Sequence, residues 1–289
     1  MISVIIPEHK EQQFVVPMLD IINRNVPSPK EVIFVSSAPY LDIPNKNKYQ
    51  FAIRVIPNVM SSGKARNIGA REAVGDTLLF MDCHVCFLSG FSYLLDTLKK
   101  NPEAVVTGGI QHVEFPSCPY GTNAAVGYGA HFSGWWRQWH WGAKDPKKDV
   151  FPVPVSCACF EMMRRQTFYD SIWGFIDVDG LGIEEELNMR LLRFGHPTIC
   201  DSRCIVGHLF KSGETSKSVR NNVYYAAAIA TVLNVFDNTL YNQIAIDGRN
   251  TLGNGFDELM DKARQEYGER RVIMSRFPHI DERLVLRVE

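Results

Sequence analysis

The sequence lacks an excess of either charge, a long apolar run and a fully paired set of cysteines. Its 289 residues include 31 Lys plus Arg and 32 Asp plus Glu, which gives a formal net charge of -1. This near-neutral balance disfavours binding of the whole protein to nucleic acid or to anionic lipid. The longest stretch of low polarity, residues 223–236, is shorter than the roughly 20 residues that a membrane-spanning helix needs. A chain of this length also buries enough surface to fold without disulfides or a structural metal.

The seven cysteines are an odd number, and the pairs Cys157/Cys159 and Cys200/Cys204 lack the spacing of common zinc sites. We therefore expect reduced thiols that pack in the interior. The first ten residues have neither the basic segment nor the long apolar segment of a secretion signal. These features predict a cytoplasmic protein.

Short β-branched runs alternate with longer helical patterns in the first third of the chain. In order, these segments are residues 4–6, 12–22, 32–35, 52–56, 65–74 and 77–81. The alternation is typical of βαβ units, so we predict an α/β fold with a mostly parallel, Rossmann-like central sheet flanked by helices. Ligands of such open sheets bind beyond the carboxyl ends of the strands. The residues to inspect are therefore 7–11, Ser36, Ser37 and 82–84.

The rest of the chain is less regular. Residues 101–154 are rich in glycine and are predicted to form a loop-rich or irregular β region. A helical period covers residues 184–194, and Gly195 and Pro197 end it. We then expect a short strand at 205–206, a buried helix over 223–236, and one more helix with an extended tail in 256–289.

Asp82 and His84 follow the apolar run that ends at Met81. A spacing of two places both side chains on one side of an extended segment, whereas Cys83 points away. A carboxylate and an imidazole are both ligands for divalent cations. The alternative is that Asp82 opens a turn and His84 is merely exposed.

Residues 62–76 lead into that strand and contain two glycines and two basic residues of interest. Gly63 and Gly69 permit a tight loop and close helix packing, and Lys64 and Arg66 stand at the expected helix start. Basic side chains at a helix start can bind phosphate.

These motifs belong to a longer ordered set: residues 3–7 with His9 and Glu11, 65–67 with Gly69, Ala73 and Gly75, 79–84, His131, Phe132, Trp135, 206–211 and 220–222. The set resembles GT-A fold glycosyltransferases, and most of all the catalytic domain of the polypeptide N-acetylgalactosaminyltransferases. That family carries Asp-x-His where most relatives have Asp-x-Asp. The resemblance covers residues 3–236, and nothing after 236 resembles the family's lectin domain.

By this resemblance, Asp82, His84 and His208 bind Mn²⁺ or Mg²⁺, which holds the diphosphate of a nucleotide-sugar donor. A cation there stabilises the negative charge that builds up on the departing nucleoside diphosphate. Lys211 falls where the family has an Arg that contacts the pyrophosphate. Residues 211–220 would then form a lid that orders over the donor.

The resemblance also implies a set of donor-binding residues at the strand ends. They are Pro7, His9, Glu11, Ser36, Ser37, Arg66, Asp82 and Lys211. Ser36 and Ser37 depart from the family, because relatives have one or two Asp there to hold uracil and ribose. Hydroxyl groups can still bond a base or a ribose.

Glu184, Glu185 and Glu186 open the predicted helix, and the resemblance assigns catalysis to Glu184 and Glu185. Glu184 best matches the Asp base of inverting relatives, whereas the retaining family has Asn there. We expect at least one of the three to do no more than compensate the helix dipole. The Asp-x-His motif favours retention of configuration.

A cluster of aromatic residues precedes this helix in the sequence: Phe132, Trp135, Trp136, Trp139 and Trp141. Their spacing fits stacking on a sugar or packing in a core, and we expect most of them to be core residues.

We therefore predict a metal-dependent glycosyltransferase that moves a sugar from a UDP-sugar (UDP-GalNAc, UDP-GlcNAc or UDP-glucose) to a hydroxyl acceptor. The acceptor is a peptide, a glycan, a small molecule or a hydroxymethylated DNA base, and the DNA alternative would require a basic face. A second alternative is a non-catalytic protein that binds sugar nucleotides. We expect one domain, with a nucleotide-binding half (1–100), an acceptor and metal half (101–236) and a C-terminal helical extension (237–289).

Overall fold

The computed structural model describes residues 1–57, 61–114, 126–133, 136–141, 148–156, 159–179, 183–210, 217–233, 235 and 238–276. The strands in these residues are β1 (Ile2–Glu8), β2 (Pro29–Ser36), β3 (Ala52–Pro57), β4 (Thr77–Met81), β5 (Val85–Ser89), β6 (Val105–His112), β7 (Val126–Ser133), β8 (Trp136–Trp141), β9 (Val150–Pro152), β10 (Phe160–Arg164) and β11 (Thr198–His208). The α-helices are α1 (Gln12–Asn25), α2 (Ser62–Glu72), α3 (Phe91–Lys100), α4 (Arg165–Asp170), α5 (Ile183–Arg193), α6 (Lys217–Val232), α7 (Asn238–Leu252), α8 (Asn254–Tyr267) and α9 (Arg271–Met274). Two 3₁₀ turns, η1 (Lys46–Lys48) and η2 (Gly268–Arg270), complete the order.

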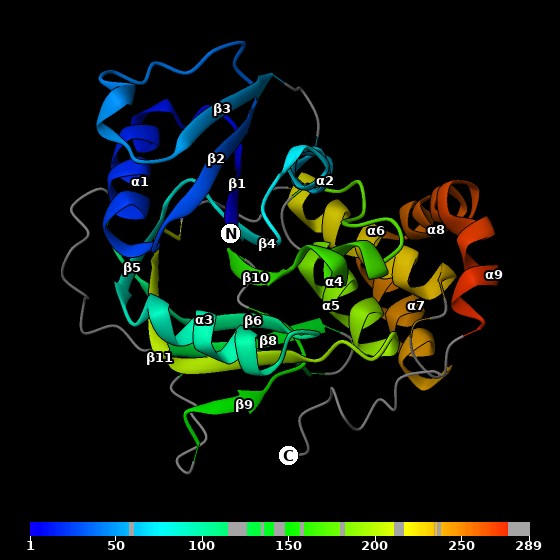
Figure 1. Ribbon diagram of the computed structural model, residues 1–289. Coiled ribbons are helices and arrows are strands. Elements are labelled where there is room, and N and C mark those ends of the chain that lie inside the picture. Colours follow the sequence, from blue (N-terminus) through cyan, green and yellow to red (C-terminus); the bar gives the residue numbers. More distant parts are fainter. Residues whose placement is uncertain are drawn as a thin grey trace.

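The strands form one sheet whose central order is β3-β2-β1-β4-β10-β6-β11-β5. The pairs β2/β3, β1/β2, β1/β4 and β6/β11 are parallel. β10 runs antiparallel between β4 and β6, and β5 and β9 pair antiparallel with β11. The predicted α/β class with a Rossmann-like, mostly parallel central sheet flanked by helices is confirmed, as Figure 1 shows.

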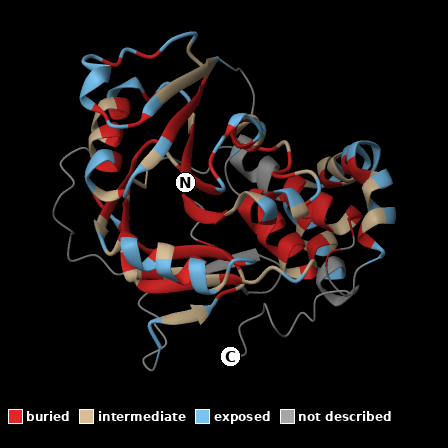
Figure 2. Ribbon diagram, in the orientation of Figure 1, coloured by how far each residue is buried: buried red, intermediate tan, exposed pale blue. Residues whose placement is uncertain are grey.

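Helices cover both faces of this sheet, and each face has its own core. Along β4, Leu78 and Phe80 pack into the core on the side of α2, α5 and α6, whereas Leu79 and Met81 pack into the core on the side of α1 and α3. Burial on both faces explains why β4 is a continuous apolar run and does not alternate with polar residues. Figure 2 shows buried residues along the central sheet and on the helices that flank it.

The strand order changes direction next to β1. The chain adds β2 and β3 on one side of β1 and then returns to place β4 on the other side. Open α/β sheets bind ligands at such a switch point, in the crevice beyond the carboxyl ends of the strands. The loop from β1 to α1 and the segment after β4 meet at this point of the sheet, where Glu11 contacts His84.

Several details differ from the sequence prediction, which named no strand at β5 or β10 and no helix at α3 or α4. β11 is far longer than the expected strand at 205–206, because a bulge between Asp201 and Ile205 lets the strand continue through polar residues. α7 was not predicted, and the extended tail after 276 lies outside the described residues. Among the described cysteines, Cys83, Cys159, Cys200 and Cys204 have free thiols, but Cys86 is disulfide-bonded, so the prediction of reduced thiols is wrong there. No described helix has the length and apolar character needed to cross a membrane.

Candidate metal centre

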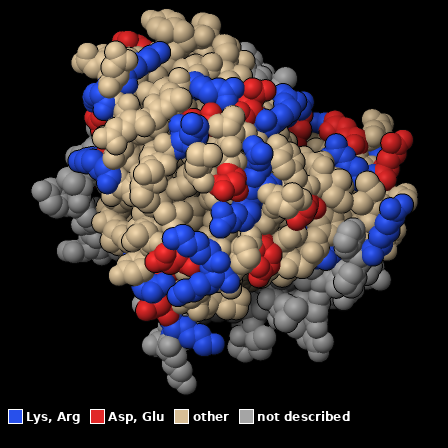
Figure 3. All heavy atoms as spheres, in the orientation of Figure 1, with Lys and Arg blue, Asp and Glu red and all other residues tan. Residues whose placement is uncertain are grey.

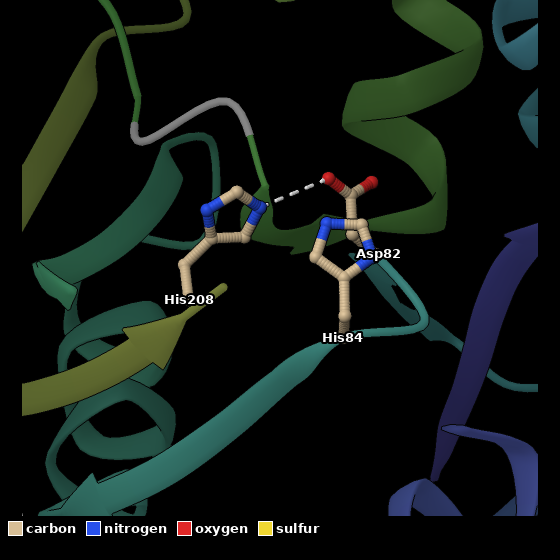
Figure 4. Close-up of side chains that lie close together, drawn as sticks. All are labelled: Asp82, His84 and His208. Carbon is tan, nitrogen blue, oxygen red and sulfur yellow. Dashed lines mark ion pairs between the residues drawn. The ribbon is translucent and has the colours of Figure 1, made fainter. Parts of the chain in front are cut away.

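Asp82, His84 and His208 converge at the carboxyl ends of β4 and β11. One possible ligand atom from each residue lies within 4.8 Å of the others. Nε2 of His208 is 3.6 Å from Oδ2 of Asp82, and the two imidazole rings are 4.8 Å apart between centroids. Figure 4 shows the three side chains pointing toward one shared space.

Strand pairing explains how residues so far apart in sequence come together. β11 pairs antiparallel with β5, so His208 stands opposite Val85, next to His84. The amide of Leu209 donates to the carbonyl oxygen of His84 at 3.2 Å. Asp82 is fixed through its own amide, which donates to the carbonyl of Cys159 beside β10 at 3.0 Å. Backbone bonds thus hold all three positions.

The donor set fits a divalent metal ion. Two imidazoles and one carboxylate are typical ligands of divalent transition metals. Burial raises the pKa of Asp82, but the nearby His208, Arg66 and His84 outweigh that effect and hold the pKa well below its ordinary value. The Asp82 carboxylate is therefore ionised over the physiological pH range, as a metal ligand must be.

Arg66 of α2 sits next to this cluster and joins it to α5. Its Nη2 atom is 2.8 Å from Oδ1 of Asp82 and 3.3 Å from Oε1 of Glu184, and only 4% of Arg66 is exposed. The guanidinium also lies 5.5 Å from the ring centroid of Phe175.

Carboxyl groups crowd around this guanidinium. Burial raises the pKa of Glu184, Arg66 counteracts that effect, and the charges of Glu185, Glu161 and Asp82 raise the pKa further. The pKa of Glu184 therefore lies well above its ordinary value. The raised pKa favours the protonated form of Glu184, and a divalent cation bound nearby would instead favour the ionised form.

All three acidic residues at the start of α5 are buried, but they differ in their partners. Glu186 binds Arg190 one turn later through two contacts of 2.7 Å, and Arg190 in turn donates to the carbonyls of Ser171 and Gly174. Glu186 is therefore structural, and its role goes beyond compensation of the helix dipole. Glu184 faces Arg66, and Glu185 is also buried in this cluster.

Glu161 of β10 is a site residue that the sequence reasoning missed. Its Oε2 atom accepts from Ser156 Oγ at 2.8 Å and from Asn188 Nδ2 at 3.0 Å. Burial raises the pKa of Glu161 even though these two bonds and Arg66 oppose the rise. A polar residue inside the apolar run of 160–163 was the only sequence signal for it.

The predicted donor-binding residues near β1 and β2 lie in different surroundings. His9 is exposed, Pro7 and Ser37 are half-buried, and Ser36 is fully buried. The Ser36 hydroxyl donates to Glu8 and accepts from the amide of Ala38 at 2.9 Å.

Glu11 is buried and approaches the metal cluster itself. Its Oε1 atom is 2.9 Å from Nδ1 of His84. Lys211, most of the predicted lid and Trp135 lie outside the described residues, as do the side chains of the other four aromatics in the predicted cluster.

The start of α2 is clamped by a distant segment, residues 175–179. The Ser62 amide donates to Asp179 at 2.7 Å, and the Lys64 ammonium is 2.5 Å from Asp177. Lys64, which the sequence offered as a phosphate ligand, is thus paired with a carboxylate. A Cβ added to Gly63 would lie 2.0 Å from the carbonyl oxygen of Ile176, so only glycine permits this contact.

The fold and the residue cluster define a class: a GT-A type α/β domain with a candidate Asp-x-His metal site at its switch point. Residues 3–171 match glycosyl transferase family 2, and this chain belongs to that family.

Curated relatives match shorter stretches. An uncharacterized glycosyltransferase from Haemophilus influenzae is 32% identical over 105 residues, which are 35% of this chain and 36% of that protein. Polypeptide N-acetylgalactosaminyltransferase 3 of Taeniopygia guttata is 27% identical over 168 residues, which are 51% of this chain and 26% of that protein. The match thus spans about a third or less of the length of these relatives.

Solved structures share the fold across nearly the whole chain. GalNAc-T7 with UDP, GalNAc and Mn²⁺ has a TM-score of 0.64 at 13% identity, over 96% of this chain and 58% of that one. S. aureus TarS 1-349 in complex with UDP-GlcNAc has a TM-score of 0.59 at 14% identity, over 94% of this chain and 83% of that one.

Proposed function

We propose that this chain is a metal-dependent glycosyltransferase that transfers a sugar from a UDP-sugar to a hydroxyl acceptor. The observation that carries the proposal is the convergence of Asp82, His84 and His208 within 4.8 Å, at the switch point of a family 2 domain. UDP-GalNAc, UDP-GlcNAc and UDP-glucose are the candidate donors.

Bound molecules in the structural neighbours support a nucleotide-sugar donor and a metal. The GalNAc-T7 structure holds UDP and Mn²⁺, and the TarS structure holds UDP-GlcNAc. A mannosyltransferase from Pyrobaculum calidifontis, similar with a TM-score of 0.53 at 13% identity over 95% of this chain and 78% of that one, is in complex with GDP-Man and Mn²⁺. UDP is our choice because two of these three structures contain it.

In this proposal, Asp82, His84 and His208 hold the metal, which when bound neutralises charge on the diphosphate leaving group. We prefer Mn²⁺ to Mg²⁺, because imidazole suits transition metals whereas Mg²⁺ favours oxygen ligands. Arg66 can exchange its contacts with Asp82 and Glu184 for contacts with phosphate oxygens. Lys211 is proposed as a second basic contact.

The acceptor hydroxyl must lose a proton during transfer, and two outcomes are possible. We propose retention, in which the leaving phosphate takes that proton on the same face of the sugar. The position of Glu184 beside Arg66, at the edge of the metal cluster, favours a second candidate. There Glu184 is the general base of an inverting transfer, and Glu185 supports it from the same helix turn.

The acceptor itself is proposed only as a hydroxyl compound. Figure 3 shows basic and acidic side chains interspersed over one face of the molecule, which agrees with the near-zero net charge. This distribution supports a peptide, glycan or small-molecule acceptor over a DNA base.

The test is release of UDP from a panel of UDP-sugars in the presence of Mn²⁺, with GDP-mannose as a control donor. We expect metal-dependent release from at least one UDP-sugar. No turnover with any donor, hydrolysis included, would support the non-catalytic binding protein instead. NMR analysis of the anomeric configuration of the product then separates retention from inversion.

A further inference from the structure

The buried carboxylate of Glu11 contacts His84, one of the three proposed metal ligands. Oε1 of Glu11 is 2.9 Å from Nδ1 of His84, an ion-pair distance at which the ring nitrogen makes no aligned hydrogen bond, and the two side chains are only 8% and 9% exposed. In Figure 4, a nitrogen of the His84 ring faces the space shared with Asp82 and His208. The imidazole thus lies between a carboxylate on one side and the proposed metal position on the other.

This arrangement has a definite chemical consequence. An imidazole that binds a metal through one nitrogen carries its proton on the other, and an acceptor there fixes both the tautomer and the ring orientation. Carboxylates in this position also raise the basicity of the ligand. The ring of Phe14, 6.1 Å from that of His84, packs against the same imidazole.

Glu11 is itself held in place by a second buried carboxylate, that of Glu8. Oε1 of Glu8 accepts from the amide of Glu11 at 2.5 Å, and its Oε2 accepts from the Ser36 hydroxyl. The carbonyl of Glu11 accepts from the amide of Phe14 at 2.8 Å in the first turn of α1. The turn between β1 and α1 is therefore fixed on both sides of Glu11, although it includes Lys10 with a φ of 57°.

We infer that Glu11 is a positioning residue of the metal centre, which acts through His84, and that Glu8 fixes Glu11 for this task. The inference rests on the proposed function and deepens it. It differs from the sequence-based expectation that Glu11 binds the donor directly. A direct donor contact would leave Mn²⁺ affinity measured without UDP unchanged when Glu11 is replaced, whereas a positioning role makes that affinity depend on Glu11.

The experiment measures binding of Mn²⁺ by electron paramagnetic resonance, with and without UDP, in the wild type, Glu11→Ala and Glu11→Gln. We expect Glu11→Ala to weaken Mn²⁺ binding by about 10- to 100-fold, as loss of such partners commonly does. Glu11→Gln should lose less, because its amide oxygen can still accept from the ring N–H. The visible absorption of bound Co²⁺ should shift in Glu11→Ala, since the geometry of the His84 ligand changes.

The matched control is Glu31→Gln, which removes a buried carboxylate at the other end of the β1–β2 pair. Glu31 accepts from the Ser3 hydroxyl at 2.6 Å, far along the strands from His84. We expect Glu31→Gln to lower thermal stability and to leave Mn²⁺ affinity unchanged. This control separates a specific effect on the metal from general loss of stability.

The outcomes distinguish this inference from the proposed function. Wild-type protein that binds Mn²⁺, together with unchanged affinity in both Glu11 variants, overturns the role of Glu11 and leaves the metal centre intact. Wild-type protein that binds no Mn²⁺, even with UDP, overturns the proposed function itself. Equal losses in Glu31→Gln and Glu11→Gln would also contradict the inference, because the effect would then be one of stability.

Discussion

At each end of the β1–β2 pair, a buried serine hydroxyl donates to a buried glutamate of the other strand, but the surroundings of the two serine–glutamate pairs differ. At the amino end, Ser3 of β1 donates its hydroxyl to Glu31 of β2 at 2.6 Å. At the carboxyl end the residues are exchanged, because Ser36 of β2 donates to Glu8 of β1. All four residues are at most 3% exposed.

At the amino end, the polar groups of this network bond to neighbouring groups of the protein. The Glu31 carboxylate also accepts from the Val74 amide at 2.7 Å and from Arg54 at 3.1 Å, and the Gly75 amide donates to the Ser3 hydroxyl at 2.8 Å. Charge and hydrogen bonds are thus balanced among neighbouring residues. Such a network stabilises the fold and has no need of a ligand.

At the carboxyl end, the network of contacts continues from β1 and β2 to the candidate metal site. Glu8 fixes Glu11, Glu11 contacts His84, and beyond them Asp82 and Glu184 share one arginine. Here carboxyls gather around few cations, which is costly unless a further positive charge is bound. The comparison teaches that an unbalanced buried network, more than a buried charge by itself, distinguishes the end of the sheet at which we propose the metal site.

The largest expected effect comes from removing a proposed metal ligand at the carboxyl end. Asp82→Ala and His208→Ala should each lower metal-dependent turnover by at least about 100-fold, because the loss of a ligand exceeds the 10- to 100-fold loss of its supporting partner. The fold should survive, since backbone bonds hold both positions. UDP release and circular dichroism measure the two quantities, and unchanged activity in both variants would remove the metal-site assignment.

The next effect concerns the clamp that positions Arg66. Gly63→Ala places a Cβ about 2.0 Å from the carbonyl oxygen of Ile176, so α2 must shift. We expect a loss of about 1 to 3 kcal/mol in the free energy of unfolding and weaker UDP binding. In the control Gly255→Ala, the nearest atom is 3.8 Å away, and urea denaturation should show little change. Equal stability of the two variants would argue against the clamp.

Substitution of Glu31, at the amino end of the β1–β2 pair, should lower the stability of the fold and leave metal binding unchanged. Burial raises the pKa of Glu31, but bonds from Ser3, Val74 and Arg54 outweigh it and hold the pKa below its ordinary value of 4.5. A carboxyl whose pKa is lower in the folded state stabilises the protein above pH 4.5, and this contribution is lost as the pH falls below 4.5 through the folded pKa.

Glu31→Gln should therefore cost about 1 to 3 kcal/mol of unfolding free energy at neutral pH, the penalty for partners left unsatisfied. Its stability should also change less than that of the wild type between pH 5 and about pH 3. Denaturation curves at several pH values measure both effects. A pH dependence identical to that of the wild type would show that Glu31 does not contribute it.

The smallest effect is expected at the exposed rim of the same network. Glu72 contacts Arg54 at 3.0 Å, but its side chain is 44% exposed. Glu72→Gln should change the free energy of unfolding by less than about 1 kcal/mol, since water and salt screen such pairs. A loss as large as that of Glu31→Gln would mean that the network depends on its rim, contrary to the burial pattern.

Segments with a clear apolar pattern were predictable from sequence. β4 covers the predicted residues 77–81, and α5 lies within one residue of the predicted 184–194 at each end. β11 was underestimated because Asp201 interrupts the pattern, yet Thr97 of α3 and Arg203 of β11 itself satisfy its carboxylate. Among the side chains of α7 that the structure describes, residues 242–252, Ile244 is the only buried apolar one, which makes a weak helical pattern.

The candidate site was predictable for those residues that belong to a recognisable sequence motif. The resemblance drew Asp82, His84 and His208 together, although the last is more than 120 residues from the others in sequence. Glu8 and Glu161 were missed as network residues, because their partners Ser36 and Asn188 are 28 and 27 residues away and follow no local spacing. Pairings of this kind depend on strand register and helix packing, which sequence periodicity alone does not specify.

The most direct test of the account is a crystal structure with UDP and Mn²⁺, with anomalous scattering used to locate the manganese. The account predicts one Mn²⁺ bound by Asp82, His84 and His208, with the diphosphate of UDP as a further ligand and Arg66 moved toward the phosphates. Bound UDP with manganese elsewhere, or with no manganese at these three residues, would contradict it.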